Sequence, residues 1–283
     1  ALFNQILQLS QFAGGIASNG TRIDAGSMAY IPEFDTRDWT GDLSAYRISP
    51  SGVIASEPEW RASQRIVEQG PATRRIFTQR VQSTAPLTLQ KISFSLGAGG
   101  FANAAQAQSD LGITAADVAR YGSVQNIISY LRGNRFEGGN PLEIRDGGVM
   151  RNRSRVVGDI LGSQPAVMGR EDYGWSILPG SPGELYRDFL AAKQTRTPVV
   201  FVGANDGMLH AFDGRMRALG GGAEMFAYVP YAVHANLKRL PDPDYFHRYF
   251  VDGSPRIGDA LLDGQWRTVL LGTTGAGGRS VLV

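Results

Sequence analysis

The sequence predicts a mainly β protein, a β-propeller with α-helical insertions, and three observations predict it. The pattern Gly-x-Leu-x-Ala-aromatic occurs twice, at 41–46 and 207–212, each time after a polar turn. A third unit, 266–283, reads as strand, glycine-rich turn and strand. The 36 glycines stand beside short apolar runs without a collagen period, which is typical of many turns. A recurring strand–turn–strand unit indicates small sheets repeated around an axis.

Composition indicates a folded, globular chain. Of 283 residues, 42% are hydrophobic and 19% are charged, so the chain can bury a core. The net charge is +2 and the arginines are mostly scattered, which disfavours nucleic-acid binding. The absence of cysteine excludes disulfides and thiolate metal sites in this sequence. No apolar run is long enough to span a bilayer, so we do not expect a transmembrane protein.

The two ends suggest a piece of a longer protein. The sequence starts without an initiator Met or a basic signal-peptide start, and it stops inside an expected strand. We therefore expect 1–283 to be part of one propeller domain, with an upstream domain and the remaining blades outside this chain. Open sheet edges invite aggregation, so we expect a protein that ends at Val283 to be insoluble or unfolded alone.

The first hundred residues predict one helix followed by strands. Apolar residues at 2, 3, 6, 7, 9 and 12 follow one face of a short helix over 2–12. A strand is expected at 27–34, and the first copy of the repeated hairpin unit at 36–49. Short strands are expected after it, around 59–61 and 74–80.

The long segment 96–195 predicts a helical insertion between the repeated hairpins. Thr114 and Ser123 are suitable N-cap residues for two short helices, and Gly133 ends the second one. A third helix is expected to begin with a capping box. It would have Ser181 as N-cap, Pro182 as the first helical residue and Glu184 as the partner of the cap, with Leu185, Phe189 and Leu190 on its buried face.

The second hairpin is the best specified element. Asn205-Asp206-Gly207 separates two apolar runs, and these residue types tolerate the positive φ of a tight turn. We expect strands at 198–203 and 208–213 with a turn at 204–207. Farther along, the sequence predicts a strand at 223–229, a short helix at 231–240 and a strand within 249–253.

Motifs for catalysis or metal binding are weak. His210, His234 and His247 are interpreted as ordinary packed or surface histidines. The acidic stretch 242–252 lacks the spacing of a calcium loop, and the glycines of 272–279 lack the Lys-Ser/Thr of a phosphate loop. Ser163 and Ser254 stand beside glycines but outside a Gly-x-Ser-x-Gly motif. We therefore assign no catalytic residue and no metal ligand.

One arginine cluster is the candidate binding site. Four arginines fall in the polar loop 133–155: Arg145, Arg151, Arg153 and Arg155. A salt-bridged surface loop is the favoured interpretation over an anion site. Because arginine and aromatic residues dominate binding hot spots, Arg151, Arg153 and Arg155 are nevertheless the candidate contact residues. We expect their joint replacement by Ala to weaken partner binding and to leave the fold intact.

Six stretches together resemble a known family. They cover most of the chain from about residue 27 onward and keep their order. The chain in these stretches is similar to the C-terminal domain of the type IV pilus tip-associated adhesins, the PilC/PilY proteins. The stretches are DWTGDLSAY at 38–46, SYLRGNRFEGG at 129–139, MRNRSRVVGDILGSQPAVMG at 150–169, PVVFVGANDGMLHAFDG at 198–214, EMFAYVPYAVHANLKRL at 224–240 and YFHRYFVDGSPRIGDALLDGQWRTVLLGTTGAGGRS at 245–280.

The resemblance implies a modified, quinoprotein-like propeller at the tip of a retractable pilus. It implies docking on minor pilins, an influence on pilus extension, retraction and twitching motility, and attachment to host cells or abiotic surfaces. The protein would be extracellular, exported through the periplasm, and not an enzyme. Calcium would bind to a loop outside this sequence. Some relatives carry Arg-Gly-Asp where this chain has Arg132-Gly133-Asn134.

The resemblance also gives the second hairpin a role. It would be the inner hairpin of a blade with an exposed turn, Leu209 and Ala211 facing one side of the sheet and His210 and Phe212 the other. Two alternatives stay open at this point: a quinoprotein-like propeller dehydrogenase, and a non-catalytic scaffold for outer-membrane assembly.

Overall fold

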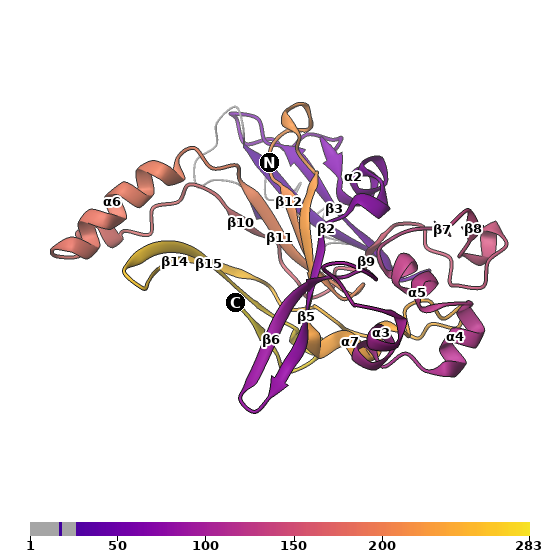
Figure 1. Ribbon diagram of the computed structural model, residues 1–283. Helices are drawn as coiled ribbons and strands as arrows, with labels where there is room; N and C mark the ends of the chain where they lie inside the picture. The colour runs from indigo at the N-terminus through magenta and orange to yellow at the C-terminus, as the bar shows by residue number, and fades with distance from the viewer. Residues whose placement is uncertain (1–16, 19–26) are drawn as a thin grey trace.

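Three stacked sheets make up the body of the protein (Figure 1). The computed structural model describes residues 17–18 and 27–283, so the helix expected at 2–12 lies outside the described residues. Within the described part of the chain, the helices are all too short or too polar to cross a membrane.

The first sheet contains the first copy of the repeated hairpin. Strands β2 and β3 pair antiparallel from Met28↔Arg47 to Asp35↔Thr40, which confirms the strand expected at 27–34 and the hairpin expected at 36–49. The sheet order is β1-β2-β3-β4, and β9 pairs with the start of β3. The strands are β1 (Ala17–Ser18), β2 (Met28–Asp35), β3 (Thr40–Arg47), β4 (Trp60–Arg61) and β9 (Val157–Gly158).

The second sheet contains the second copy. Its order is β10-β11-β12-β13-β5-β6, and β11 pairs with β12 from Val199↔Asp213 to Ala204↔Met208, which confirms the hairpin at 198–213. The pairing of β13 with β5 is parallel and joins segments about 150 residues apart. The strands are β5 (Ile76–Thr84), β6 (Leu87–Ser93), β10 (Ala166–Met168), β11 (Val199–Ala204), β12 (Met208–Asp213) and β13 (Glu224–Val229).

The third sheet follows at the end of the chain. It has the order β14-β15-β16, with β14 at Arg256–Leu262, β15 at Gln265–Thr273 and β16 at Val281–Leu282. The segments 36–49, 198–213 and 266–283 therefore lie in three different antiparallel units, as the sequence predicts. A separate two-stranded ribbon is formed by β7 (Phe136–Glu137) and β8 (Asn140–Pro141).

The stacking of the sheets explains the repeated pattern. Leu43 and Ala45 of the first copy share a buried cluster with Val200, Val202 and Phe212 of the second sheet. Ala211 of the second copy packs on the opposite face of that sheet, against Ile257 and Leu270 of the third. In each copy the small and branched apolar residues thus face the next sheet. This arrangement confirms a mainly β fold whose sheets are stacked as blades.

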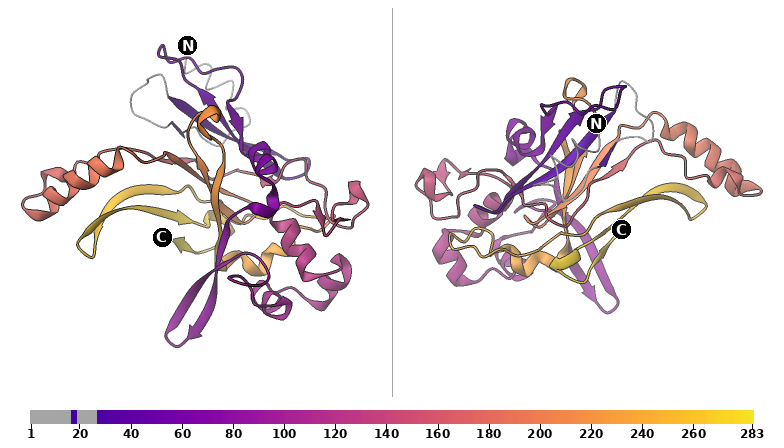
Figure 2. Two further views of the ribbon diagram at one scale, coloured as in Figure 1. Left: turned by 45° about the horizontal axis from the view of Figure 1, so that its top comes forward. Right: turned by 180° about the vertical axis from the view of Figure 1, so that it is seen from behind.

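Helix α2 packs beside the first sheet, and the other helices lie at two ends of the body (Figure 1). Helices α3, α4, α5 and α7 gather on one side, around a core that also includes Ile76 and Val229 of the second sheet. Helix α6 projects on the opposite side together with β14 and β15 (Figures 1 and 2). The helices are α2 (Ala62–Gln69), α3 (Ala104–Leu111), α4 (Ala115–Tyr121), α5 (Val124–Leu131), α6 (Ser181–Lys193) and α7 (His234–Leu237).

Two of the expected helix starts are confirmed. Thr114 and Asp117 form a reciprocal capping box at α4, and the Ser123 side chain caps α5. The expectation for α6 is wrong, because Ser181 is already inside the helix and Gly180 precedes it without a side-chain cap. Its buried face is also different: Tyr186 and Lys193 are buried, because they pack toward β14 and β15, whereas Leu185 is exposed.

Two other local expectations are wrong. The strand expected within 249–253 is irregular backbone, because Phe250 donates its N–H to the side chain of Asn205 instead of to a neighbouring strand. The turn of the second hairpin is buried, not exposed: Asn205 is 2% exposed and Gly207 is buried as well. The chain around β9 and around Phe250 covers this turn, and both segments are distant in sequence.

Candidate binding loop

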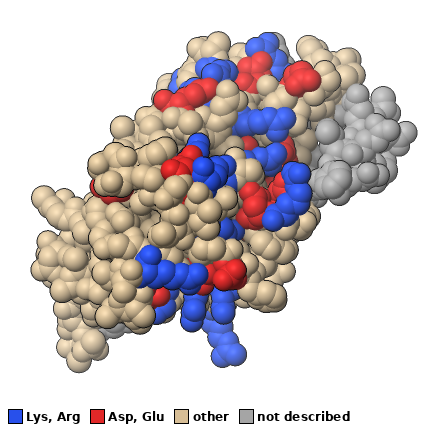
Figure 3. Space-filling model, turned by 90° about the vertical axis from the view of Figure 1, so that its right-hand side faces the viewer, with Lys and Arg blue, Asp and Glu red and all other residues tan. Residues whose placement is uncertain are grey.

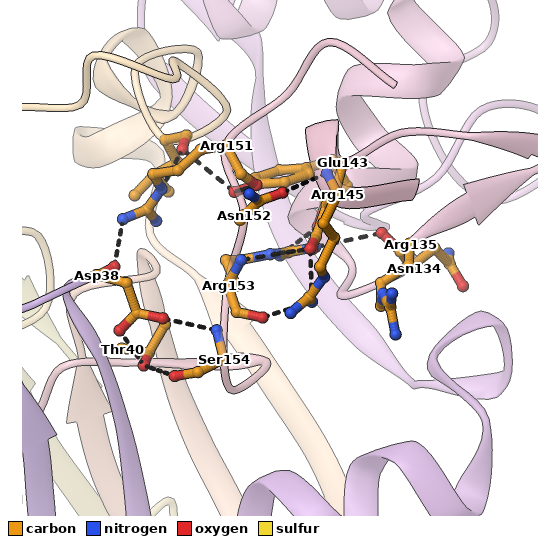
Figure 4. Close-up of polar contacts among 12 residues, drawn as sticks. Asp38, Thr40, Asn134, Arg135, Glu143, Arg145, Arg151, Asn152, Arg153 and Ser154 are labelled. Carbon is orange, nitrogen blue, oxygen red and sulfur yellow. Dashed lines mark hydrogen bonds and ion pairs between the residues drawn. The ribbon is translucent and has the colours of Figure 1, made fainter. Parts of the chain in front are cut away.

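The candidate site is the arginine loop, defined as residues 133–155. It leaves α5, forms the β7–β8 ribbon and a single 3-10 turn at Ile144–Asp146, and returns to β9. In Figure 1 it lies at the right-hand end of the molecule, next to α4 and α5. Figure 4 shows that its arginines point toward several different partners.

Arg153 points into the protein. Its side chain is 8% exposed, and its Nε donates to Oε1 of Glu143 over 3.1 Å. Its Nη1 donates to the backbone oxygen of Tyr130 over 2.8 Å, and the guanidinium carbon lies 3.6 Å from the centroid of the Tyr130 ring. This arginine therefore ties the loop to α5.

Glu143 is the central acceptor of the loop. Its side chain is 1% exposed, and it also receives Nη2 of Arg145 at 2.6 Å. The same Nη2 donates to the backbone oxygen of Arg153 over 2.6 Å. A buried carboxylate with two guanidinium partners satisfies the rule that buried charges are paired. The salt-bridged interpretation of the cluster is thereby confirmed.

Arg151 and Arg155 fasten the loop to other elements. Arg151 donates to the backbone oxygens of Leu240 (3.0 Å) and Asp38 (2.8 Å), and its guanidinium lies 4.2 Å from the ring centroid of Tyr245. Arg155 pairs with Glu33 at 3.4 Å and lies 3.9 Å from Asp42. Both side chains therefore join the loop to the first sheet or to the chain after α7.

The three candidate arginines do not converge on a common outward point. Each one is engaged within the protein, and only Arg151 and Arg155 are partly exposed. On the face that carries the loop, basic and acidic side chains mostly lie side by side (Figure 3). The role of these arginines in binding a partner stays a prediction. Their contacts show that they also hold the loop in place.

The sequence reasoning missed two features of this loop. The first is Glu143, the carboxylate that pairs with Arg145 and Arg153. Its position eight residues before Arg151 could have indicated an acidic partner for the arginines. The second feature is the exposure of the aliphatic side chains Ile144 and Val149 in a loop that reads as polar, whereas Phe136 is an aromatic residue that the sequence already marks as a candidate contact residue. Phe136, Ile144 and Val149 are exposed, each near a pair of glycines at 138–139 or 147–148.

A second polar cluster lies beneath the buried turn. Nδ1 of His210 is 2.8 Å from Oε1 of Glu224, and its Nε2 is 3.1 Å from Oδ2 of Asp206. Arg74 completes the cluster with two bonds to Glu224, at 2.5 and 2.7 Å. Arg132 at the end of α5 donates to the backbone oxygen of Arg74 over 2.7 Å. The cluster thus links the second sheet to the helical side of the protein.

Opposite charges set the protonation of this cluster. Burial alone would lower the pKa of His210, but the carboxylates of Asp206 and Glu224 outweigh it and raise the pKa to about 9. Burial would raise the pKa of Glu224, but Arg74 and His210 hold it at about 2. At neutral pH, His210 is therefore an imidazolium between two carboxylates.

The other histidines are packed as well. His234 shares a 2.6 Å contact with the hydroxyl of Thr78, and burial lowers its pKa to about 4. Nε2 of His247 lies 2.9 Å from Oδ2 of Asp159, and the His247 ring is tilted by 34° against the ring of Trp39, with the centroids 4.0 Å apart. Throughout residues 17–18 and 27–283, no three His, Cys, Asp or Glu side chains are grouped to hold a metal ion.

The two serines considered as nucleophiles hold two loops together. Ser163 donates to the backbone oxygen of Gly253, and Ser254 donates to that of Gly162. Ser254 also accepts the N–H of Gln164 at 2.9 Å. These reciprocal bonds join the chain before β10 to the chain before β14, so both serines have a structural role.

The similarity to known proteins covers nearly the whole chain. The family of the PilY1 beta-propeller domain matches residues 157–283. A type IV pilus biogenesis factor PilY1 homolog of Xylella fastidiosa is 37% identical over an alignment of 303 positions. The alignment covers 99% of this chain and 20% of that protein. The type IV pilus biogenesis factor PilY1 of Pseudomonas aeruginosa strain UCBPP-PA14 is 32% identical, over 87% of this chain and 20% of that protein.

The chain therefore spans about a fifth of the length of these relatives. No solved structure matches it. The stacked sheets, the repeated hairpins and the similarity over nearly the full chain agree with one another. Nearly the whole chain is similar to PilY1 proteins, and residues 157–283 match the beta-propeller domain of that family.

Proposed function

We propose that the protein is a type IV pilus biogenesis factor that acts outside the cell at the pilus tip, after export through the periplasm. It would support the balance of pilus extension and retraction, and with it twitching motility and attachment to host cells or abiotic surfaces. Minor pilins at the tip would be its partners. The observation that carries this proposal is the 37% identity to a PilY1 homolog over 99% of the chain.

The architecture supports a binding role within such a factor. Three stacked sheets form the body of the protein, and ion pairs around the buried Glu143 hold the arginine loop beside it. Loops fixed on rigid scaffolds are common places for recognition. We therefore place a contact with a pilus protein on this loop, where Arg151, Arg153 and Arg155 contribute directly or by holding its shape.

We further propose that 1–283 belongs to one propeller domain, with 96–195 as its insertion. The first sheet packs on the second much as the second packs on the third, which supports blades of one continuous ring. The remaining blades and an upstream domain would come from the rest of the protein. A calcium-binding loop would belong to that remaining part.

Deletion and complementation test the function. A strain without the whole gene is complemented with the wild-type gene, and surface pilin, twitching zones and attached cells are measured. The proposal expects all three to fall in the deletion strain and to recover on complementation. Unchanged pili and motility in the deletion strain would contradict it. Oxidation of alcohols or aldose sugars by the purified full-length protein, supplied with a quinone cofactor and calcium, would favour a dehydrogenase instead.

A further inference from the structure

A lysine and an aspartate form a buried ion pair where helix α6 meets the third sheet (Figure 1). Lys193 is the last residue of α6, and Asp259 lies in the middle of β14. Nζ of Lys193 is 2.8 Å from Oδ2 of Asp259, and the two side chains are 1% and 0% exposed. Lysine is among the residues that are least often fully buried, so this pair is an unusual feature of the fold.

Aromatic rings surround the pair. The ring centroids of Tyr173 and Phe189 lie 4.7 and 5.9 Å from Nζ of Lys193. The buried ring of Tyr186 packs against Trp266, with the centroids 4.6 Å apart. Holding two opposite charges in such a place carries a large desolvation cost. An uncharged link between the same two side chains would not carry this cost.

The hydrogen bonds of the carboxylate suit a substitution at its carbon atom. The hydroxyl of Thr268 donates to Oδ1 of Asp259 over 3.0 Å, and the hydroxyl of Tyr186 donates to Oδ2 over 2.9 Å. A donor at Oδ1 stabilises the negative charge that develops there when a nucleophile adds to Cγ. A hydroxyl at Oδ2 can assist the departure of that oxygen by proton transfer. The amine of Lys193 is the nucleophile in contact with the same carboxylate.

The remaining contact of the amine fits the product of such a reaction. Nζ of Lys193 also donates to the backbone oxygen of Glu171 over 2.7 Å. An amide between the two side chains would keep one N–H for this acceptor, and its oxygen would keep the hydrogen bond from Thr268. The amide would therefore leave no buried polar atom without a partner.

We propose that Lys193 and Asp259 condense to an intramolecular amide cross-link in the folded protein. The ammonium gives one proton to Oδ2, and the free amine attacks Cγ. The C–N bond forms, the bond from Cγ to Oδ2 breaks, and a second proton from the nitrogen joins the leaving oxygen, which departs as water. One positive and one negative charge disappear together, and no oxidant or cofactor is needed. Groups held in contact in this way react with effective molarities of up to about 10⁵–10⁸ M.

The cross-link would close a covalent loop in the chain. The residues between Lys193 and Asp259 include β11, β12 and β13. The bond would fasten α6 to the third sheet around the second hairpin. Because a cross-link restricts the unfolded chain, it would make this part of the protein harder to unfold. This inference does not rest on the proposed function.

The test is peptide mapping of the purified, folded full-length protein. The protein is denatured and digested with trypsin, which cleaves after arginine and after free lysine, and the peptides are sequenced by tandem mass spectrometry. Lys193→Arg is the matched variant, because it keeps the positive charge and removes the amine. The pair of Lys238 with Asp117 is the internal control, since it is 3.6 Å apart and both side chains are partly exposed.

The inference expects one branched peptide as the main form, in which 188–196 is joined to 257–267 with the loss of one water. Fragment ions should place the bond between Lys193 and Asp259, and cleavage after Lys238 should be normal. The branched peptide should be absent from Lys193→Arg. Recovery of 188–193 and 257–267 only as separate wild-type peptides would overturn the inference, and so would a bond to Asp263 instead of Asp259. The wild-type map decides the matter even if Lys193→Arg does not fold.

Discussion

Nδ1 of His210 lies 2.8 Å from Oε1 of Glu224, and both side chains are almost completely shielded from solvent. His210 is on β12 and Glu224 begins β13, so this contact joins neighbouring strands of the second sheet. Asp206 and Arg74 extend the contact to the hairpin turn and to the chain before β5. The polar cluster therefore lies where the blades and the helical side meet.

The first prediction concerns pH. The pKa of His210 is about 9 in the folded protein and 6.5 in the unfolded chain. Because the folded state binds the proton more tightly, this stabilisation is fully present below pH 6.5 and is lost as the pH rises through 9. The melting temperature of the protein should therefore decrease as the pH is raised from 7 to 9.5. In the variant His210→Gln, the melting temperature should change less with pH over this range. An equally large decrease in the variant would contradict the claim that His210 causes it.

The second prediction concerns the buried partner of Glu224. Arg74→Met removes both guanidinium bonds and leaves Glu224 with His210 alone. Removing one partner of a buried ion pair typically costs about 3–5 kcal/mol. Arg37→Met is the control, because its pair with Asp35 is on the surface and its side chain is 89% exposed. That change should leave the stability almost unaltered, because an exposed ion pair is screened by solvent. Chemical denaturation measures the free energy of unfolding of both variants. An equal loss in Arg74→Met and Arg37→Met would contradict the claim that the buried cluster stabilises the fold.

The third prediction concerns the covered turn. A Cβ atom on Gly158 would lie 2.2 Å from the backbone nitrogen of Asp206, so Gly158→Ala must push β9 away from the turn. We expect a loss of about 1–3 kcal/mol, typical of overpacking. Gly258→Ala on β14 is the control, since nothing lies within 4 Å of its added Cβ. Hydrogen exchange of the peptide around 204–208 should increase in Gly158→Ala and not in the control.

The fourth prediction separates the arginines of the loop. Arg153→Ala removes a buried partner of Glu143, whereas Arg155→Ala removes pairs on a side chain that is 32% exposed. We expect Arg153→Ala to cost about 1–3 kcal/mol and to loosen the loop, and Arg155→Ala to cost less than about 1 kcal/mol. Limited proteolysis within 133–155 measures this directly. Replacing all three arginines should therefore not leave the loop intact, contrary to the expectation from sequence.

Local signals in the sequence predicted the hairpins well. Gly207 adopts φ of 91° in the turn that Asn-Asp-Gly indicates, and the apolar runs beside it form the paired strands. Helix α3 could have been found too, because Asn103 caps it through the backbone N–H of Gln106. Helix α2 gave no such signal, since it begins after Arg61 without a side-chain cap.

Contacts between distant segments could not be predicted in this way. The parallel pairing of β13 with β5 and the cover over Asn205 depend on where remote parts of the chain return. The same holds for the arginine loop. Its residue types indicated salt bridges, but only the fold decides that Glu143 is buried and Ile144 is exposed. Composition alone therefore suggested contact through arginine, whereas the structure engages each of these arginines within the protein.

The amount of pilin sheared from the cell surface tests the central claim most directly. The gene-deletion strain is complemented with the full-length gene carrying Arg151→Ala/Arg153→Ala/Arg155→Ala, and another with Arg37→Met, at matched protein levels. The account predicts that surface pilin and twitching fall toward the level of the deletion strain with the triple variant and stay at the wild-type level with Arg37→Met. Wild-type amounts of surface pilin with the triple variant would contradict the claim that this loop of the propeller acts in pilus biogenesis.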